Sequence, residues 1–330
     1  MPKTSDNFRL ILIFCGATVA SIFLLISALA LLPPRDDFDP SNPYWNGHLI
    51  FSKITNTSVF DIYRSDPKKV VLFVIGPSSD IPKRSIDIWK RFVEGGGTLV
   101  LMDETGIVNC VLEEFGLRIR VDGRPMLDTV FYYNSWKVPK IIDVRKSDLT
   151  TNISVIFMNV PSVLNISVYN SDLRVLAYSS SFSFLDSDGN GYPSDDERMG
   201  PFPVAVEVTY ASGRVILLSD SSLFTNSIIN LGDNMRLLKN IAGNRVVAID
   251  SSVWRRSMHA EFREIIIFAY NFASIPEIKY SIVVVTLITV YVLASRRWSS
   301  PGGHDELQTL LIKHPNWDRR LLEKLREERG

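Results

Sequence analysis

The sequence predicts an α/β domain with a parallel sheet, placed between two transmembrane helices. Continuous apolar runs at 69–75 (KVVLFVI) and 98–102 (TLVLM) are typical of strands that are buried on both faces. The segment between them has apolar residues at helical spacing, and a strand-helix-strand order implies parallel strands. Two further apolar segments, 10–32 and 274–295, are of membrane-spanning length or close to it.

Lysine and arginine placement predicts the orientation in a cell membrane. Lys3 and Arg9 precede the first apolar segment, and Arg296 and Arg297 follow the second, so both termini are expected in the cytoplasm and residues 33–275 outside. A cleaved signal peptide is the alternative for the first segment, because Ala28-Leu29-Ala30 resembles a cleavage site. The predicted parts are a cytoplasmic N-terminus (1–9), a transmembrane helix (10–32), an extracytoplasmic α/β domain (33–243), a membrane-proximal stalk (244–273), a second transmembrane helix (274–295) and a cytoplasmic helical tail (296–330).

Composition excludes some classes of protein. The net charge is zero, so no strong positive field indicates a nucleic-acid partner. The two cysteines, Cys15 and Cys110, fall in the first apolar segment and in the domain, where they cannot pair, and the domain therefore has no disulfide framework. Its core has to be stable without one, and a chain of about 240 residues is long enough for that.

The first half of the domain reads as alternating strands and helices. Pro82 suits the first turn of a helix whose apolar face is Ile86, Trp89 and Val93, and the glycines at 95–97 stop it. In order, the residues predict an extended lead-in (33–47), a short helix (48–54), an edge strand (58–62), the strand 69–75, that helix, the strand 98–102, a helix (106–115) closed by Gly116, and a third strand of the parallel sheet (117–121).

The second half is less regular. Residues 122–170 alternate short apolar runs with polar turns and predict a strand-rich excursion. Three more strands follow at 173–179, 203–210 and 214–218, and a helical stretch continues to 241. Two leucine stripes in the tail, separated by Pro315, predict either a partner-binding face or a self-packed helical pair: Leu307, Leu310 and Leu311, then Leu321, Leu322 and Leu325.

Polar residues directly follow two of the apolar strands. If these strands are neighbours, their side chains meet in one crevice at the carboxyl ends of the sheet, where open α/β sheets bind ligands. The alternative is that these residues cap the following helices. The candidate ligand-binding residues are Asp103, Glu104, Thr105, Asn109, Asp220 and Ser221.

No nucleophilic motif stands in the domain. There is no G-x-S-x-G or G-x-C-x-G, and Cys110 lies about seven residues past a strand end, on a predicted helix and not on a sharp elbow. His48 and His259 do not follow a strand, where a triad base normally lies. A non-catalytic binding protein is therefore favoured, and a surface hydrolase that uses the carboxylate crevice is the alternative.

The acidic stretch Asp186–Glu197 matches the calcium-loop pattern D-x-[DN]-x-[DN]-G-x₅-E in every fixed position. It predicts a structural Ca²⁺ bound by the side chains of Asp186, Asp188, Asn190 and Glu197 and by the carbonyl of Tyr192. Pro201 forbids a following helix, so the loop is expected to join two strands rather than form an EF-hand. An acidic, solvated turn that binds nothing is the alternative.

Three N-x-[ST] motifs, at Asn56, Asn152 and Asn165, are candidate glycosylation sites in the exported region. The motif is short and also arises by chance. Their use requires a compartment that glycosylates asparagine.

The order of several short motifs resembles a known family. The motifs are Val74-Ile75-Gly76-Pro77, the run 96–106 with Asn109, and the run 213–226 with Asp233-Asn234. Across about residues 40–243 the chain is similar to the membrane-anchored domain of unknown function 4350 proteins of archaea and bacteria. That resemblance implies an amidotransferase-like, flavodoxin-like fold related to class I glutamine amidotransferases.

The chain departs from true amidotransferases, because their elbow cysteine and its histidine are missing. The resemblance therefore implies a non-catalytic relative that works beside membrane-associated ATPase or export machinery. The expected partners are membrane lipid, a cytoplasmic protein bound by residues 298–330, and an extracellular ligand or glycan.

Overall fold

The computed structural model divides the chain into two compact units, Met1–Arg263 and Glu264–Gly330. It describes residues 13–14, 16–18, 20–21, 23–27, 32–57, 66–78, 80–254, 257–298, 311–318, 320 and 322. The edge strand expected at 58–62, parts of the first apolar segment and most of the tail leucines lie outside the described residues.

One mixed sheet of seven strands forms the centre of the first unit. Its first four strands are parallel and the remaining pairings are antiparallel, so the α/β class is confirmed while the sheet is only partly parallel. In spatial order the strands are β14 (Val246–Ile249), β1 (Val70–Ile75), β2 (Thr98–Met102), β13 (Gly213–Leu218), β12 (Pro203–Tyr210), β10 (Leu173–Tyr178) and β7 (Asp143–Val144).

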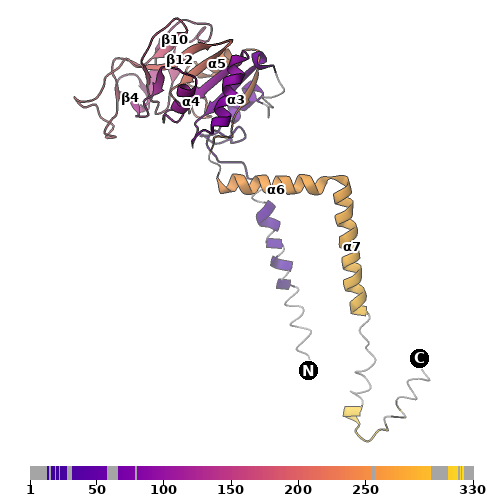
Figure 1. Ribbon diagram of the computed structural model, residues 1–330. Coiled ribbons are helices and arrows are strands. Elements are labelled where there is room, and N and C mark those ends of the chain that lie inside the picture. The colour runs from indigo at the N-terminus through magenta and orange to yellow at the C-terminus, as the bar shows by residue number, and fades with distance from the viewer. Residues whose placement is uncertain are drawn as a thin grey trace. The chain divides into compact units, whose positions relative to one another are not determined.

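Alternate side chains of the apolar strands enter two separate cores, one on each face of the sheet. On β1, Phe73 belongs to one core and Leu72 to the other, and both side chains are buried. Helices α3 (Lys83–Glu94) and α4 (Asn109–Glu114) cover the Leu72 face, and α2 (Leu49–Thr55) and α5 (Asn234–Ala242) cover the Phe73 face. These layers explain why the strands read as continuous apolar runs (Figure 1).

The third predicted strand does not join this sheet. Residues Ile119–Val121 (β3) pair antiparallel with β9 (Leu164–Ile166), so the expected parallel β-α-β-α-β unit ends after its second strand. Its place beside β2 is taken by β13, which comes from far along the chain and pairs Val215 with Leu99. A strand of three residues, one of them the charged Arg120, is too short to specify a partner, and the longer apolar run of β13 makes the larger ladder.

The domain also extends beyond residue 243, where the sequence predicts a stalk. Residues Val246–Ile249 form β14, which pairs in parallel with β1 at the edge of the sheet. Trp254 then donates its ring N–H to the carbonyl of Ile75, and Asp250 accepts from the ring N–H of Trp89 at 2.9 Å. The start of the predicted stalk is therefore part of the α/β domain.

The excursion between β3 and β10 is strand-rich, as expected. It contains β4 (Met126–Asp128), β5 (Tyr132–Tyr133), β6 (Ser135–Ile141), β7 and β8 (Ile156–Phe157), followed by β9, and β11 (Ser183–Leu185) pairs back onto β4. A short 3₁₀ helix, Pro67–Lys69, precedes β1. Two predicted helices are shorter than expected, because 106–108 and 222–233 form turns that lead into α4 and α5.

Two apolar helices follow the domain, α6 (Met258–Ser274) and α7 (Pro276–Trp298). Among the described residues, no single helix combines the length and apolarity needed to cross a membrane. The stretches Met258–Phe272 and Pro276–Thr289 meet that test only together, with a bend of 80° between them (Figure 1). Near the N-terminus, Gly16–Ser27 is a shorter apolar helix.

Candidate functional site

The predicted crevice lies where the sheet changes the direction of its connections. Strands β2 and β13 are adjacent and parallel, with Met102 opposite Leu218. The chain leaves β2 toward α4 on one face and leaves β13 toward α5 on the other. Ligands of open α/β sheets bind at such a switch point, outside the carboxyl ends of the strands. Both strand ends therefore carry their polar residues at the expected position.

Asp103 is committed to the turn that follows β2. Its carboxylate accepts hydrogen bonds from the backbone N–H groups of Thr105 at 2.7 Å and Val108 at 2.9 Å, and from the Thr105 hydroxyl. Asn109 likewise binds both backbone groups of Val121, with distances of 2.8 and 2.9 Å. Asp103 thus shapes the loop between β2 and α4, and Asn109 joins the start of α4 to β3, while α4 itself has no side-chain cap.

Glu104 and Asp220 meet across the crevice. Glu104 accepts hydrogen bonds from the backbone N–H of Ser221 at 2.9 Å and from its hydroxyl. Asp220 accepts from the backbone N–H groups of Asn159 and Ser222, both at 2.7 Å. The structure thus brings Glu104, Asp220 and Ser221 together, but each uses its acceptors or donor within the protein.

Burial makes the carboxyl group of Asp220 a weaker acid than usual. Its side chain is completely buried, and the loss of hydration, followed by the negative charge of Glu104, raises its pKa well above the ordinary value of 3.8. The two N–H donors act in the opposite direction. Hydrolases also use a carboxyl group with a raised pKa beside a second carboxylate. Whether this pair can act on a substrate therefore depends on its access to solvent.

The excursion closes the crevice over these groups. Asn159 reaches Asp220, and the backbone N–H of Ser162 donates to the carbonyl of Ser219 at 2.9 Å. Asp103, Asp220 and Ser221 have no exposed surface. A substrate therefore cannot reach Asp103 or Asp220 in this arrangement, whereas Glu104 is half-buried and the side chain of Thr105 is exposed.

Three acidic residues of the predicted calcium loop come together. Ligand oxygens of Asp186, Asp188 and Glu197 all lie within 4.8 Å of one another. Asp186 accepts from the N–H groups of Gly189 and Gly191, which have positive φ values of 74° and 77° and bend the loop around the carboxylates.

Glu197, at the twelfth position, and Asn190, at the fifth, are held within the loop. Glu197 accepts from the N–H groups of Ser187 at 2.6 Å and Ser194 at 3.2 Å. Asn190 donates to Asp188 at 2.6 Å and accepts from the N–H of Tyr192. The residues at positions one, three and twelve thus form an acidic cluster that could hold a metal ion, while the amide of Asn190 is used inside the loop.

A hollow of about 480 Å³ adjoins this loop, and it was not predicted from the sequence. It lies between the β5–β6 hairpin and residues 186–192. Trp136 and Tyr192 contact one another there edge to face, with ring centroids 5.6 Å apart. The only sequence signal is the density of aromatic residues in 131–136, which reads equally as strand propensity.

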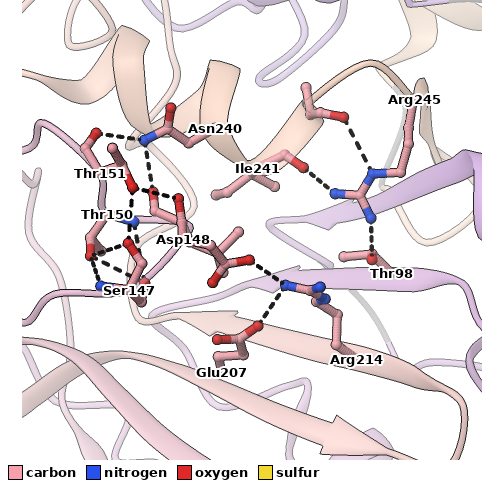
Figure 2. Close-up of polar contacts among 12 residues, drawn as sticks. Thr98, Ser147, Asp148, Thr150, Thr151, Glu207, Arg214, Asn240, Ile241 and Arg245 are labelled. Atoms are coloured by element: carbon pink, nitrogen blue, oxygen red, sulfur yellow. Dashed lines mark hydrogen bonds and ion pairs between the residues drawn. The ribbon is translucent and has the colours of Figure 1, made fainter.

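A second polar cluster lies at the opposite, amino-terminal end of the parallel strands (Figure 2). Arg214 binds Glu207 at 2.8 Å and Asp148 at 3.2 Å. Arg245 donates to the hydroxyl of Thr98 and to the last carbonyls of α5, at Ile241 and Ala242. Both guanidinium groups therefore join secondary-structure elements, and the cation at the end of α5 also suits its helix dipole.

The three asparagines of the candidate glycosylation sites differ in exposure. Asn56 and Asn152 are exposed and take left-handed backbone conformations. Asn165 is half-buried, and its amide nitrogen donates to Asp122 at 2.8 Å. Glycosylation at all three positions stays a prediction.

A family model described as Domain of unknown function (DUF4350) matches residues 52–242, which is more than half of the chain. The chain belongs to this family. The DUF4350 segment contains both strand ends of the crevice and the whole calcium-type loop, whereas β14 lies just beyond it. No protein of curated function matches the chain in sequence.

Solved structures resemble parts of the DUF4350 chain only distantly. They include the mmIFT52 N-terminal domain (16% identity, TM-score 0.41, covering 52% of this chain and 76% of that one) and Cytoplasmic Protein STM3548 from Salmonella typhimurium (14%, 0.33, 57% and 76%). A β-galactosidase from Bacillus circulans sp. alkalophilus is similar at 15% identity and a TM-score of 0.31, over 55% of this chain and 23% of that one.

Proposed function

We propose that this protein is a membrane-anchored, non-catalytic binding or scaffolding protein. Its α/β domain, outside the membrane, binds a ligand or glycan, and its tail, residues 298–330, engages a cytoplasmic protein. The observation that carries the non-catalytic part is the closed crevice, in which Asp103 and Asp220 are fully buried and hydrogen-bonded to backbone N–H groups. Catalytic groups have to be within reach of a substrate, and these are not.

The exposed apolar surface of the last two helices supports the membrane anchor. Phe268 and Tyr270 on α6 are each 71% exposed, and Leu287 and Tyr291 on α7 are 64% and 73% exposed. Apolar patches of this extent are costly in water and favourable in lipid. Arg296 and Arg297 follow the apolar stretch, and basic residues at this position support a cytoplasmic tail.

Two finer features belong to the same proposal. The loop at 186–197 binds one structural Ca²⁺ through Asp186, Asp188 and Glu197, with affinity of the weak extracellular kind, about 10⁻⁴–10⁻³ M. The parallel part of the sheet, with helices on both faces, is a remnant of an amidotransferase-like, flavodoxin-like fold from which the catalytic elbow has been lost.

Cysteine accessibility tests the orientation. Single cysteines are introduced into a chain in which Cys15 and Cys110 are replaced by serine, and intact cells are treated with a membrane-impermeant maleimide. Positions within 33–275 should react from outside, and positions within 300–330 should react only after permeabilisation. Labelling of the tail in intact cells would disprove the proposed orientation.

Affinity capture tests the scaffold. The full-length protein and a version that ends at residue 297 are purified from the same cells under identical conditions. A cytoplasmic protein should be recovered with the full-length chain and lost with the shortened one. Equal recovery from both would show that the tail does not recruit a partner.

A further inference from the structure

The hollow beside the calcium-type loop is built from two segments that are far apart in the sequence. Tyr132, Ser135 and Trp136 come from the β5–β6 hairpin, and Asn190 and Tyr192 come from the loop. Leu127 of β4 contributes to the lining beneath them and is buried. Figure 1 shows β4 and the loops around it on the opposite side of the domain from α3.

Aromatic rings in this hollow remain open to solvent. Tyr132 is 43% exposed and Tyr192 is 67% exposed, and neither belongs to a buried core of the domain. Trp136 is half-buried, so one part of its ring is fixed by the protein while the rest is accessible. Exposed aromatic faces grouped around a concavity indicate a surface that a ligand covers.

The positions of the rings are fixed before any ligand arrives. Tyr192 meets Trp136 edge to face at an interplanar angle of 85°. The hairpin is anchored by Tyr133, whose ring packs at 76° against that of Phe157, with centroids 5.7 Å apart. Aromatic anchors that are already ordered lose little conformational entropy on binding.

The polar groups of the hollow select the chemistry of the ligand. Asn134 and Ser135 provide neutral donors and acceptors, and Lys137 and Asp186 carry opposite charges that balance. A ligand that suits this lining is uncharged, has many hydroxyl groups and also presents an apolar face to an aromatic ring. A pyranose sugar has this combination, with axial C–H groups on one face and hydroxyl groups around its edge.

We propose that the hollow formed by Tyr132, Trp136 and Tyr192 binds a neutral oligosaccharide. The sugar stacks on the accessible face of Trp136, and the amide of Asn134 binds its hydroxyl groups. Because Tyr192 belongs to the calcium-type loop, an ordered loop keeps the second ring in position. The inference rests on the proposed function as a binding protein and names the ligand class.

Isothermal titration calorimetry on the full-length protein tests this proposal. The protein is kept in a zwitterionic detergent, because detergents with sugar headgroups would compete. The probes are cellohexaose, maltohexaose and chitohexaose. At least one should bind saturably, and Trp136→Ala should weaken that binding by about tenfold or more.

Two variants separate stacking from a general loss of structure. Trp136→Phe keeps an aromatic face and should bind more tightly than Trp136→Ala. Trp45→Ala removes another tryptophan, 71% exposed and outside the hollow, and should bind as the unaltered protein does. Far-ultraviolet circular dichroism verifies that each variant is folded.

The proposal is overturned if none of the three oligosaccharides binds, or if Trp136→Ala binds them as well as the unaltered protein. Saturable binding of tryptone peptides, with no binding of any sugar, would also overturn it by assigning the hollow to peptides. None of these results would alter the outcome of the cysteine-labelling or affinity-capture experiments. Failure of the saccharide proposal is therefore distinguishable from failure of the proposed function.

Discussion

His48 is a fully buried histidine in an aromatic environment. Its Nδ1 lies 2.9 Å from the carbonyl of Phe38, its ring stacks on that of Phe38, and its Nε2 has no hydrogen-bond partner. Burial lowers its pKa from 6.5 to about 4, although the hydrogen bond to Phe38 acts in the opposite direction. The folded protein therefore holds this ring neutral, with Nδ1–H as the donor.

Acidification should consequently destabilise the fold through this one residue. Its pKa is lower in the folded chain than in the unfolded chain, so its contribution is complete above pH 6.5 and is lost as the pH falls toward 4. The loss is on the order of 3 kcal/mol. Thermal denaturation from pH 7 to pH 4 should show a smaller decrease in Tm for His48→Phe than for the unaltered protein. His314→Phe, at an exposed tail position, should decrease as the unaltered protein does.

The raised pKa of Asp220 predicts that its contribution to stability changes with pH in the opposite direction to that of His48. Its raised pKa favours the folded state at low pH, and this contribution is lost as the pH rises from 3.8 through the raised value. Glu104→Gln removes the neighbouring negative charge while its amide oxygen can still accept both hydrogen bonds from Ser221. The variant should show a shallower decrease in stability between pH 5 and pH 8. Urea titrations at several pH values measure the free energy of unfolding. If it changes with pH in the variant as it does in the unaltered protein, Glu104 does not influence Asp220.

The residues of the crevice show how far sequence reasoning extends. An aspartate just after each of two buried strands correctly predicts a meeting place at one edge of the sheet, provided the strands are neighbours, and they are. The sequence could not reveal that Asn159 and Ser162 cover that place. Those contacts depend on the path of an irregular excursion, which no local pattern specifies.

For a single strand or helix, the length and regularity of its apolar pattern determine whether it can be predicted from the sequence. Strands β1 and β2 have five or six consecutive buried residues, and both were predicted within one residue. Strands β3 and β14 have only three and four residues, and their partners are chosen by tertiary packing. The residues of the aromatic hollow escaped prediction for a different reason. In β6, Trp136 alternates with the exposed Ser135 and Lys137, as an ordinary core-facing residue of a strand does.

The calcium-type loop makes a prediction at the same scale. With a Kd of 10⁻⁴–10⁻³ M, about 10 mM Ca²⁺ should stabilise the fold by about 1.4–2.7 kcal/mol relative to a chelator. Asp188→Ala removes a ligand at the third position and should abolish most of this increase. Asp195→Ala removes an exposed carboxylate at a position that supplies no ligand, and should retain it. Identical Tm values in calcium and in chelator would identify the loop as an ordinary acidic turn.

For the whole molecule, the sheet defines where the domain ends. A segment 33–243 lacks β14, and so exposes the apolar edge of β1 and loses the contacts of Trp89 with Asp250 and of Trp254 with Ile75. A segment 33–257 retains them. We expect the longer segment to unfold cooperatively and the shorter one to aggregate, because an unpaired apolar strand edge recruits other chains. Size-exclusion chromatography and calorimetry distinguish the two, and equal Tm values would mean that β14 is dispensable.

The path of the chain at Asp36 and Ser257 has a mechanical consequence. The carboxylate of Asp36 accepts a hydrogen bond from the backbone N–H of Ser257 at 3.1 Å, so the polypeptide enters and leaves the domain through one narrow neck. Tension between the two flanking segments therefore pulls this neck apart first and reaches the strands only afterwards. A domain whose two ends are adjacent can also be inserted into a loop of another protein, because the two ends of that loop then stay close together.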